Sequence, residues 1–116
     1  MTEKRVLIVE DEYAIASEIE SILRDAGIQD VVSVATEGAA LKEVLCGGWD
    51  AVVADANLKG VKIDRVAAAL LDKGIPLLIV TGYNFESLSP QISDVPRISK
   101  PFKGRDLLGK LIQIMA

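Results

Sequence analysis

VLIVEDE, at residues 6–12, is a short apolar run that ends in three consecutive acids. Four apolar residues in a row, rich in Val and Ile, are typical of a strand that is buried on both faces. The acids Glu10, Asp11 and Glu12 follow this strand directly, and they require either a cation or a position on the surface. We therefore expect a strand at Arg5–Val9 that delivers carboxylates to one edge of a sheet.

Further apolar runs follow along the chain, each separated from the next by a segment of helical periodicity. Apolar residues that recur every three or four positions indicate helices with one buried face. Besides Arg5–Val9, the runs predict strands at residues 31–34, 49–55, 76–81 and 97–99. The helical stripes are Ile15, Ile19, Ile22, Leu23 and Ala26; Ala40, Leu41, Val44 and Leu45; Ile63, Val66, Ala67, Leu70 and Leu71; and Leu107, Leu108, Leu111, Ile112 and Met115.

Several residues predict where these helices begin and end. Gly27 is suited to the position after the first helix, where positive φ is common, and Thr36 is a plausible N-cap of the second. Phe102 and Leu107 have the spacing of a hydrophobic staple at the start of the last helix. Between the fourth and fifth strands, residues 84–97 contain Pro90 and several serines, so any helix in this segment should be short.

Five strands that alternate with helices predict an α/β fold, in which a parallel sheet is covered on both faces and its crossovers are right-handed. A chain of 116 residues is long enough for one continuous core, so we expect residues 1–116 to form one domain. In sheets of this kind, ligands bind in the crevice at the carboxyl ends of the strands. The initial methionine favours a free-standing chain.

Composition excludes several classes of function. The net charge is −4 and the positive residues are scattered, which disfavours nucleic-acid binding. No apolar run approaches the ~20 residues of a membrane span, and the N-terminus lacks the pattern of a signal peptide. Cys46 is the only cysteine and there is no histidine, so an intrachain disulfide, a zinc cluster and histidine-based catalysis are excluded. We expect a soluble, cytoplasmic protein.

Polar side chains occur at the end of four of the five predicted strands. The first ends in Glu10 and Asp11, the third in Asp55 and the fourth in Thr81, while the fifth leads into Lys100. The carboxyl ends of parallel strands lie on the same edge of a sheet. We therefore expect these five side chains to converge, although they are far apart in sequence.

Three carboxylates at one edge need a counter-charge. Two carboxylates ~4 Å apart repel by roughly 4 kcal/mol at an effective dielectric of ~20, and Lys100 alone does not offset this for three acids. Oxygen ligands without His or Cys favour a hard ion, above all Mg²⁺. Mg²⁺, a lysine and the hydroxyl of Thr81 around Asp55 form a site suited to phosphoryl transfer, with Asp55 as a carboxylate nucleophile.

At this point the chain closely resembles the receiver domain of two-component response regulators. The resemblance extends from residue 6 to residue 115, and LIVEDE, DAVVADANL, LLIVTG and ISKPF carry it in the expected order. It implies a flavodoxin-like fold of five βα units, a three-layer sandwich with strand order 2-1-3-4-5. It also implies a phosphoryl donor that is a histidine kinase or a histidine phosphotransfer protein, and a signalling role without enzymatic turnover of its own.

The resemblance also implies individual roles. Asp55 would be the phosphoacceptor, Glu10 and Asp11 the acidic pair for Mg²⁺, and the backbone carbonyl of Asn57 a further ligand of the ion. Thr81 would be the switch hydroxyl and bind the phosphoryl group together with Lys100. Gly82 is the small residue that many family members carry after the threonine. Phosphorylation would then change a protein-binding surface formed by the fourth helix, the fifth strand and the fifth helix.

The sequence departs from the family pattern at four positions. The acidic pair is Glu10 and Asp11 instead of two aspartates, and Lys59 stands where many receivers have proline, which predicts a less rigid loop. Arg97 replaces the aromatic residue usually found three positions before the lysine, so the coupled threonine–aromatic switch cannot operate in its common form. Tyr83 gives the sequence TGY, which is similar to single-domain receivers with a Thr-Gly-aromatic motif, and we expect it to take over part of the switch; ordinary packing is the alternative.

Two other functions remain as alternatives. The first is an aspartate-nucleophile phosphatase of the haloacid-dehalogenase type, but Asn57 stands where its general acid would be and no cap insertion is present. The second is an interaction module that keeps the fold without being phosphorylated, and the complete set of strand-end residues argues against it. Glycine-rich nucleotide-binding motifs follow none of the strands.

Overall fold

A five-stranded parallel sheet forms the centre of the computed structural model, which describes residues 3–82 and 90–116. Its spatial order is β2-β1-β3-β6-β7, which corresponds to 2-1-3-4-5 when the strands of this sheet alone are counted along the chain. The predicted strand order is therefore confirmed. The bounds are β1 (Arg5–Val9), β2 (Asp30–Val34), β3 (Ala51–Asp55), β6 (Leu77–Thr81) and β7 (Arg97–Ser99).

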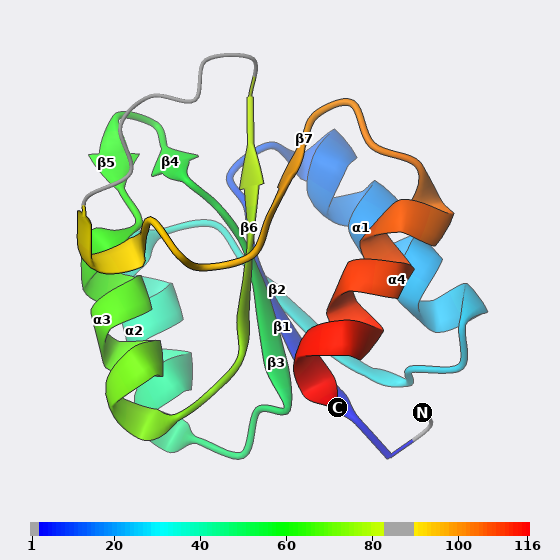
Figure 1. Cartoon of the computed structure of the whole chain (residues 1–116), viewed down its shortest axis with the longest axis horizontal. Helices are drawn as coiled ribbons and strands as arrows, with labels where there is room; N and C mark the ends of the chain where they lie inside the picture. The colour runs from blue at the N-terminus through cyan, green and yellow to red at the C-terminus, as the bar shows by residue number, and fades with distance from the viewer. Residues whose placement is uncertain (1–2, 83–89) are drawn as a thin grey trace.

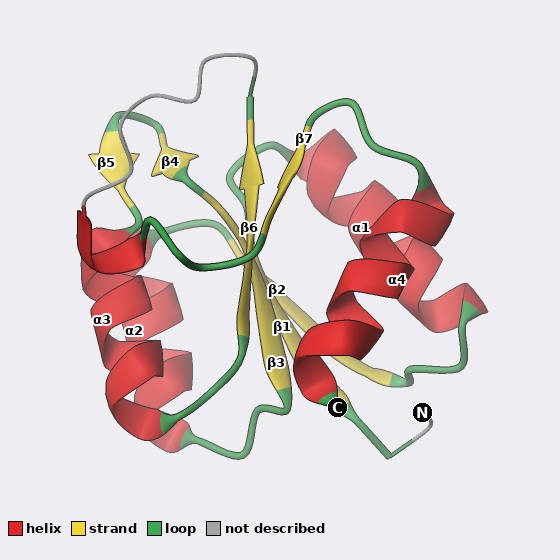
Figure 2. Cartoon of the chain, in the orientation of Figure 1, coloured by secondary structure: helices red, strands yellow, loops and turns green. Residues whose placement is uncertain are grey.

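Helices cover both faces of this sheet, as the predicted three-layer sandwich requires (Figure 1). One face carries α1 (Tyr13–Asp25) and α4 (Gly104–Met115), and the other carries α2 (Glu37–Cys46) and α3 (Asp64–Lys73). Figure 2 shows the sheet between the two helical layers. Within the described parts of the chain, no helix is long and apolar enough to cross a membrane.

Two hydrophobic cores lie on the two faces of the sheet. Leu7 and Val9 of β1 pack in the core with α2 and α3, whereas Val6 and Ile8 pack in the core with α1 and α4. All four side chains are fully buried. An apolar run without alternation is therefore what β1 needs, because both of its faces are covered.

The predicted helix ends are confirmed at two positions. Thr36 is the N-cap of α2, and its hydroxyl accepts a hydrogen bond from the backbone N–H of Ala39 over 3.1 Å. Gly27 follows Ala26, the C-cap of α1, and has φ 97°. This left-handed conformation is favourable for glycine and disfavoured for residues with a Cβ atom.

In three of the predicted apolar stripes, one residue is exposed instead of buried. Leu45, Leu71 and Ile112 are 73%, 51% and 47% exposed. Each directly follows a fully buried residue of the same helix, namely Val44, Leu70 or Leu111. Because successive helical residues are rotated by about 100°, only one of two adjacent apolar residues can occupy the centre of the buried face.

The third strand is shorter than predicted, since it begins at Ala51 instead of at Trp49. Trp49 is instead turned toward the chain before the strand. Its indole N–H donates to the carbonyl of Glu43 over 2.9 Å, and the guanidinium of Arg5 lies 4.4 Å from its ring centre. Trp49 thus contacts the Glu43 carbonyl and the Arg5 side chain from a position outside the sheet ladder.

A small hairpin follows β3 that the sequence analysis did not predict. It consists of β4 (Asn57–Leu58) and β5 (Val61–Lys62), which pair antiparallel. The later connection, between β6 and β7, contains a single 3-10 turn, η1 (Pro90–Ile92), in its described part. This short turn is consistent with the expectation that any helix there is short.

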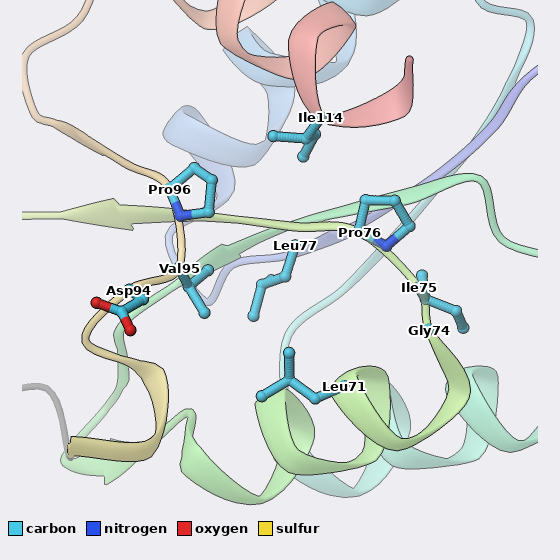
Figure 3. Close-up of a pocket in the computed structure, with 9 residues that line it drawn as sticks. All are labelled: Leu71, Gly74, Ile75, Pro76, Leu77, Asp94, Val95, Pro96 and Ile114. Atoms are coloured by element: carbon cyan, nitrogen blue, oxygen red, sulfur yellow. The ribbon is translucent and has the colours of Figure 1, made fainter.

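A hollow of about 490 Å³ lies at the amino ends of β6 and β7, between α3 and α4 (Figure 3). It lies at the opposite ends of the strands from the carboxylates that follow β1 and β3. Asp94 is its one carboxylate, and the other lining residues are Leu71, Gly74, Ile75, Pro76, Leu77, Val95, Pro96 and Ile114. A single acid among apolar side chains does not make a cation site.

Candidate phosphoryl-acceptor site

Three carboxylates meet at the carboxyl edge of the sheet, as the sequence predicts. Glu10 and Asp11 directly follow β1, and Asp55 is the last residue of the neighbouring strand β3. One oxygen atom from each carboxylate lies within 4.8 Å of those of the other two. Glu10 is 3% exposed and Asp55 is 8% exposed, so two of the three acids are held away from bulk water.

Lys100 supplies the positive charge for two of these acids. Its Nζ atom lies 3.1 Å from Asp55 Oδ2, to which it donates a hydrogen bond, and 3.2 Å from Glu10 Oε1. The backbone N–H of Lys100 donates to the carbonyl of Thr81 over 2.7 Å. This backbone contact extends the pairing of β6 with β7 and brings the lysine to the same edge as the carboxylates.

Glu10 has a strongly shifted pKa in this cluster. Burial raises the pKa of its carboxyl from 4.5 to about 7, and the negative charge of Asp55 contributes in the same direction. The N–H of Glu12, which donates to Glu10 Oε2 over 3.1 Å, and the charge of Lys100 only partly oppose this rise of the pKa. Near pH 7, Glu10 is therefore divided between its protonated and ionised forms.

Lys100 shows the complementary effect. Burial lowers the pKa of its ammonium group, but the hydrogen bond and charge of Asp55 and the charge of Glu10 outweigh this, and the pKa is raised above its usual value. Lys100 therefore stays charged at neutral pH. One ammonium facing two carboxylates, with Asp11 beside them, leaves the cluster negative whenever Glu10 is ionised.

Two buried oxygen atoms at this edge accept no hydrogen bond from the described residues, namely Glu10 Oε1, which has only the ion-pair contact of 3.2 Å with Lys100, and Thr81 Oγ1. Burying an unpaired polar atom is unfavourable, so such atoms are uncommon and often mark a place where a ligand binds. A carboxylate oxygen is suited to a cation. A hydroxyl group such as that of Thr81 is suited to a ligand oxygen.

These residues fit a magnesium ion. All three candidate ligands are carboxylates, and carboxylate oxygen is the type of ligand that Mg²⁺ prefers. One ammonium, that of Lys100, faces Glu10 and Asp55, and Asp11 lies beside them, so the cluster lacks positive charge when all three acids are ionised. A divalent cation beside Glu10 and Asp11 would supply it, while Lys100 already pairs with Asp55.

Asn57 takes part in the site through its backbone. Its N–H donates to Asp55 Oδ1 over 3.0 Å, so both oxygens of Asp55 are engaged, one by Asn57 and one by Lys100. The side chain of Asn57 turns to the hairpin, where Oδ1 accepts from the N–H of Gly60 over 2.7 Å. The sequence analysis proposed only the carbonyl of Asn57, and the side-chain contact was missed because the hairpin was not foreseen.

The other residues singled out from the sequence lie at different distances from the cluster. Arg97 pairs with Ile79 in the sheet, and its guanidinium donates to the carbonyl of Ser93. Gly82 is exposed, and a Cβ atom added to it would meet nothing within 4 Å among the described residues. Glu12 is the exposed N-cap of α1. Tyr83 lies outside the described residues.

Comparisons with known proteins agree with this geometry. Residues 6–112 match the family model of the response regulator receiver domain. Sensory transduction protein RegX3 of Mycobacterium tuberculosis is 30% identical over 115 residues, which is 95% of this chain and 50% of the relative. The chain thus spans about half the length of the curated relatives that it matches.

Solved structures give the same result. SdrG from Sphingomonas melonis is 35% identical, with a TM-score of 0.85 over 99% of this chain and 98% of SdrG. A response regulator receiver protein from Sinorhizobium medicae is 26% identical, with a TM-score of 0.84 over 99% and 97% of the two chains. The match of the family model covers the strands that carry Glu10, Asp11, Asp55, Thr81 and Lys100. This chain belongs to the family of response regulator receiver domains.

Proposed function

We propose that this receiver domain accepts a phosphoryl group on Asp55 as part of a two-component system or phosphorelay. The observation that carries the proposal is the contact between Asp55 Oδ2 and Lys100 Nζ, in a cluster where the buried hydroxyl of Thr81 has no hydrogen-bond partner among the described residues. A carboxylate nucleophile, a fixed cation and a free hydroxyl are the parts needed to receive a phosphoryl group.

In this reaction, a carboxylate oxygen of Asp55 attacks phosphorus and the bond from phosphorus to the donor breaks. For a phosphohistidine donor, the broken bond is P–N, and the leaving imidazole takes up a proton. Lys100 holds Asp55 and carries a positive charge for the phosphoryl oxygens, while Thr81 Oγ1 is free to donate a hydrogen bond to one of them. The product is an acyl phosphate on Asp55.

Magnesium is part of the proposal. Glu10, Asp11 and Asp55, with the carbonyl of Asn57, would hold the ion, and when bound it would neutralise negative charge on the phosphoryl group. A receiver domain of similar fold, from the sensor histidine kinase PA1611 of Pseudomonas aeruginosa, is described with a magnesium ion coordinated in its active site cleft. It is 22% identical to this chain and has a TM-score of 0.85 over 97% of each chain.

A protein donor also fits the surface beside Lys100. A hollow of about 240 Å³ there is lined by Ile15, Glu18, Lys100, Pro101 and Phe102. Tyr13, at the start of α1, is 86% exposed. Apolar groups next to the acceptor suit a histidine kinase or histidine phosphotransfer protein, whose phosphohistidine must reach Asp55, and we place this exchange in the cytoplasm.

Phosphorylation would then change a surface used by a downstream protein. A backbone hydrogen bond joins Thr81 and Lys100 at the ends of β6 and β7. Movement of the Thr81 hydroxyl toward a phosphoryl group would therefore shift β7, and this shift would displace α4, which follows β7 in the chain. Arg97 occupies the place of the usual aromatic switch residue in β7. We propose that Tyr83 takes part of this role.

We further propose that the chain has no enzymatic turnover on external phosphate esters. An aspartate-nucleophile phosphatase needs a general acid near its nucleophile, and Asn57 stands in that place with a carboxamide that has no acidic proton. The side chain of Asn57 is moreover engaged with Gly60. Hydrolysis of generic phosphomonoesters at a steady rate would contradict this part of the proposal.

The test is phosphotransfer from purified histidine kinases of the source organism, each first phosphorylated on histidine. The wild type should acquire the phosphoryl group from at least one kinase within seconds to minutes, in a reaction that requires Mg²⁺. Asp55→Asn, which keeps the size of the side chain, should acquire none. Equal labelling of the wild type and Asp55→Asn would contradict the assignment of the acceptor.

A further inference from the structure

The carboxylate of Asp55 is held by two separate elements. Lys100, after β7, donates to Oδ2, while the backbone N–H of Asn57, in the hairpin after β3, donates to Oδ1 over 3.0 Å. A nucleophilic carboxylate reacts through one lone pair, so its orientation affects the rate as much as its charge does. The contact from Lys100 follows from the site described above, whereas the contact from Asn57 requires the hairpin to stay in place.

Three features hold the hairpin against the body of the domain. Leu58 is 3% exposed and packs in the core with α2 and α3. The N–H of Ile63 donates to the carbonyl of Ala56 over 3.2 Å, which closes the base of the hairpin. The remaining closure, at the tip, is the hydrogen bond of 2.7 Å from the Gly60 N–H to Oδ1 of Asn57.

The tip of the hairpin has an unfavourable backbone conformation for its sequence. Lys59 has φ 50° and Gly60 has φ 88°, the pair of positive values that a type I′ turn requires. Glycine adopts this conformation readily, but lysine does not, because its Cβ atom approaches the backbone carbonyl in the left-handed region. The hydrogen bond of 2.7 Å from the Gly60 N–H to the Asn57 side chain offsets this unfavourable conformation.

We propose that the side chain of Asn57 is a positioning residue for the acceptor. By accepting from the N–H of Gly60 in the turn at residues 58–61, it fixes the backbone N–H of its own residue on Asp55 Oδ1. The Asn57 side chain thereby makes the loop rigid, an effect that proline has at position 59 in many receivers. This inference rests on the proposed function, because it assigns Asn57 a role in orienting Asp55 for phosphoryl transfer.

The experiment compares Asn57→Ala, which removes the acceptor, with Asn57→Asp, which keeps one in the same place. Asn57 is exposed, so both variants should fold. Amide hydrogen exchange at residues 57 and 60 is measured by NMR, and phosphorylation by acetyl phosphate is followed by intact mass at saturating Mg²⁺. Lys59→Asn, which suits a type I′ turn better and keeps the Asn57 side chain, serves as the control.

For Asn57→Ala, we expect exchange at residues 57 and 60 to accelerate and the maximal phosphorylation rate to fall about five- to tenfold, the worth of about one hydrogen bond. The acetyl phosphate concentration for half-maximal rate should not change. Asn57→Asp should restore slow exchange at residue 60 and recover most of the rate, and Lys59→Asn should resemble the wild type in both measurements.

Two results would overturn the inference. One is an Asn57→Ala variant with wild-type rate and wild-type exchange; the other is a reduced rate with unchanged exchange at residue 57, which would mean that Asn57 acts directly on the ligand. Failure of the proposed function looks different. The wild type itself would then gain no mass, while the exchange measurements would still show whether the Asn57 side chain holds the turn.

Discussion

We expect Glu10 to make the stability of the domain depend on pH, together with its affinity for magnesium if the ion binds as proposed. Burial raises the pKa of this carboxyl from 4.5 to about 7 in the folded protein. Between these two values the folded state binds more protons than the unfolded chain, so stability falls as the pH rises from about 4.5 to 7. The difference in pKa corresponds to a loss of at most about 3 kcal/mol by pH 8.

Lys100 does not reverse this trend between pH 5 and 8. Lys100 has a raised pKa, so its contribution is fully present below the usual lysine pKa and is lost only in the alkaline range. Roughly a tenth of Glu10 is ionised at pH 6 and roughly nine tenths at pH 8, which follows from a pKa of about 7. If Mg²⁺ binds the ionised form, its apparent dissociation constant should be about tenfold lower at pH 8.

Urea denaturation from pH 5 to 8, with EDTA and with Mg²⁺, measures the first effect, and isothermal titration of Mg²⁺ at pH 6 and pH 8 measures the second. Without Mg²⁺, the free energy of unfolding should fall toward pH 8, and Mg²⁺ should restore it. Glu10→Gln should be nearly insensitive to pH in both assays and bind Mg²⁺ more weakly. An equal pH dependence in the wild type and Glu10→Gln would refute the reasoning.

Three further substitutions test other parts of the structure. Lys100→Met removes the ammonium that contacts Asp55, and we expect phosphorylation by acetyl phosphate to slow by about a hundredfold or more, measured by intact mass. Lys59→Pro introduces a residue fixed near φ −65° where the chain has φ 50°, so the free energy of unfolding in urea should fall by more than about 1 kcal/mol; an unchanged value would mean that the turn is not fixed. Thr36→Ala removes the hydroxyl that caps α2 and should cost about 1 kcal/mol in the same assay, whereas Thr36→Ser should cost little.

The sheet and the convergence of the acids could be predicted because strong local patterns specify them. β1 is buried on both faces, so its apolar run has no alternation that could be confused with an exposed strand. Once the strands are parallel, their carboxyl ends must share an edge, and Glu10, Asp55 and Lys100 then have to meet. The ion pair observed between Asp55 and Lys100 therefore follows from topology more than from any local signal.

The hairpin after β3 could not be predicted because its signals are weak. Its strands have only two residues each, and a lysine occupies a turn position for which Asn or Gly is usual. Lys59 predicts a less rigid loop, and the structure shows a turn in which the N–H of Gly60 donates to Oδ1 of Asn57. The one available clue was Gly60, a residue that readily adopts positive φ, three positions after an asparagine.

The burial of Glu10 was also beyond the sequence. Three consecutive acids look alike in a pattern, yet Glu10 is 3% exposed while Glu12 is exposed. The difference arises because Glu10 continues directly from β1 under Lys100, whereas Glu12 caps the first turn of α1. Glu10 can be distinguished from the surface residue Glu12 only when the positions of Lys100 and Asp55 in the folded domain are known.

The most direct test of the central claim is the intact mass of the protein after incubation with acetyl phosphate, in Mg²⁺ and in EDTA. The account predicts the gain of one phosphoryl group in Mg²⁺, little gain in EDTA and no gain in Asp55→Asn. Mapping of the modified peptide should place the group on Asp55. An unmodified wild type in Mg²⁺, or a phosphoryl group on another residue, would contradict the claim that these side chains form a phosphoryl-acceptor site.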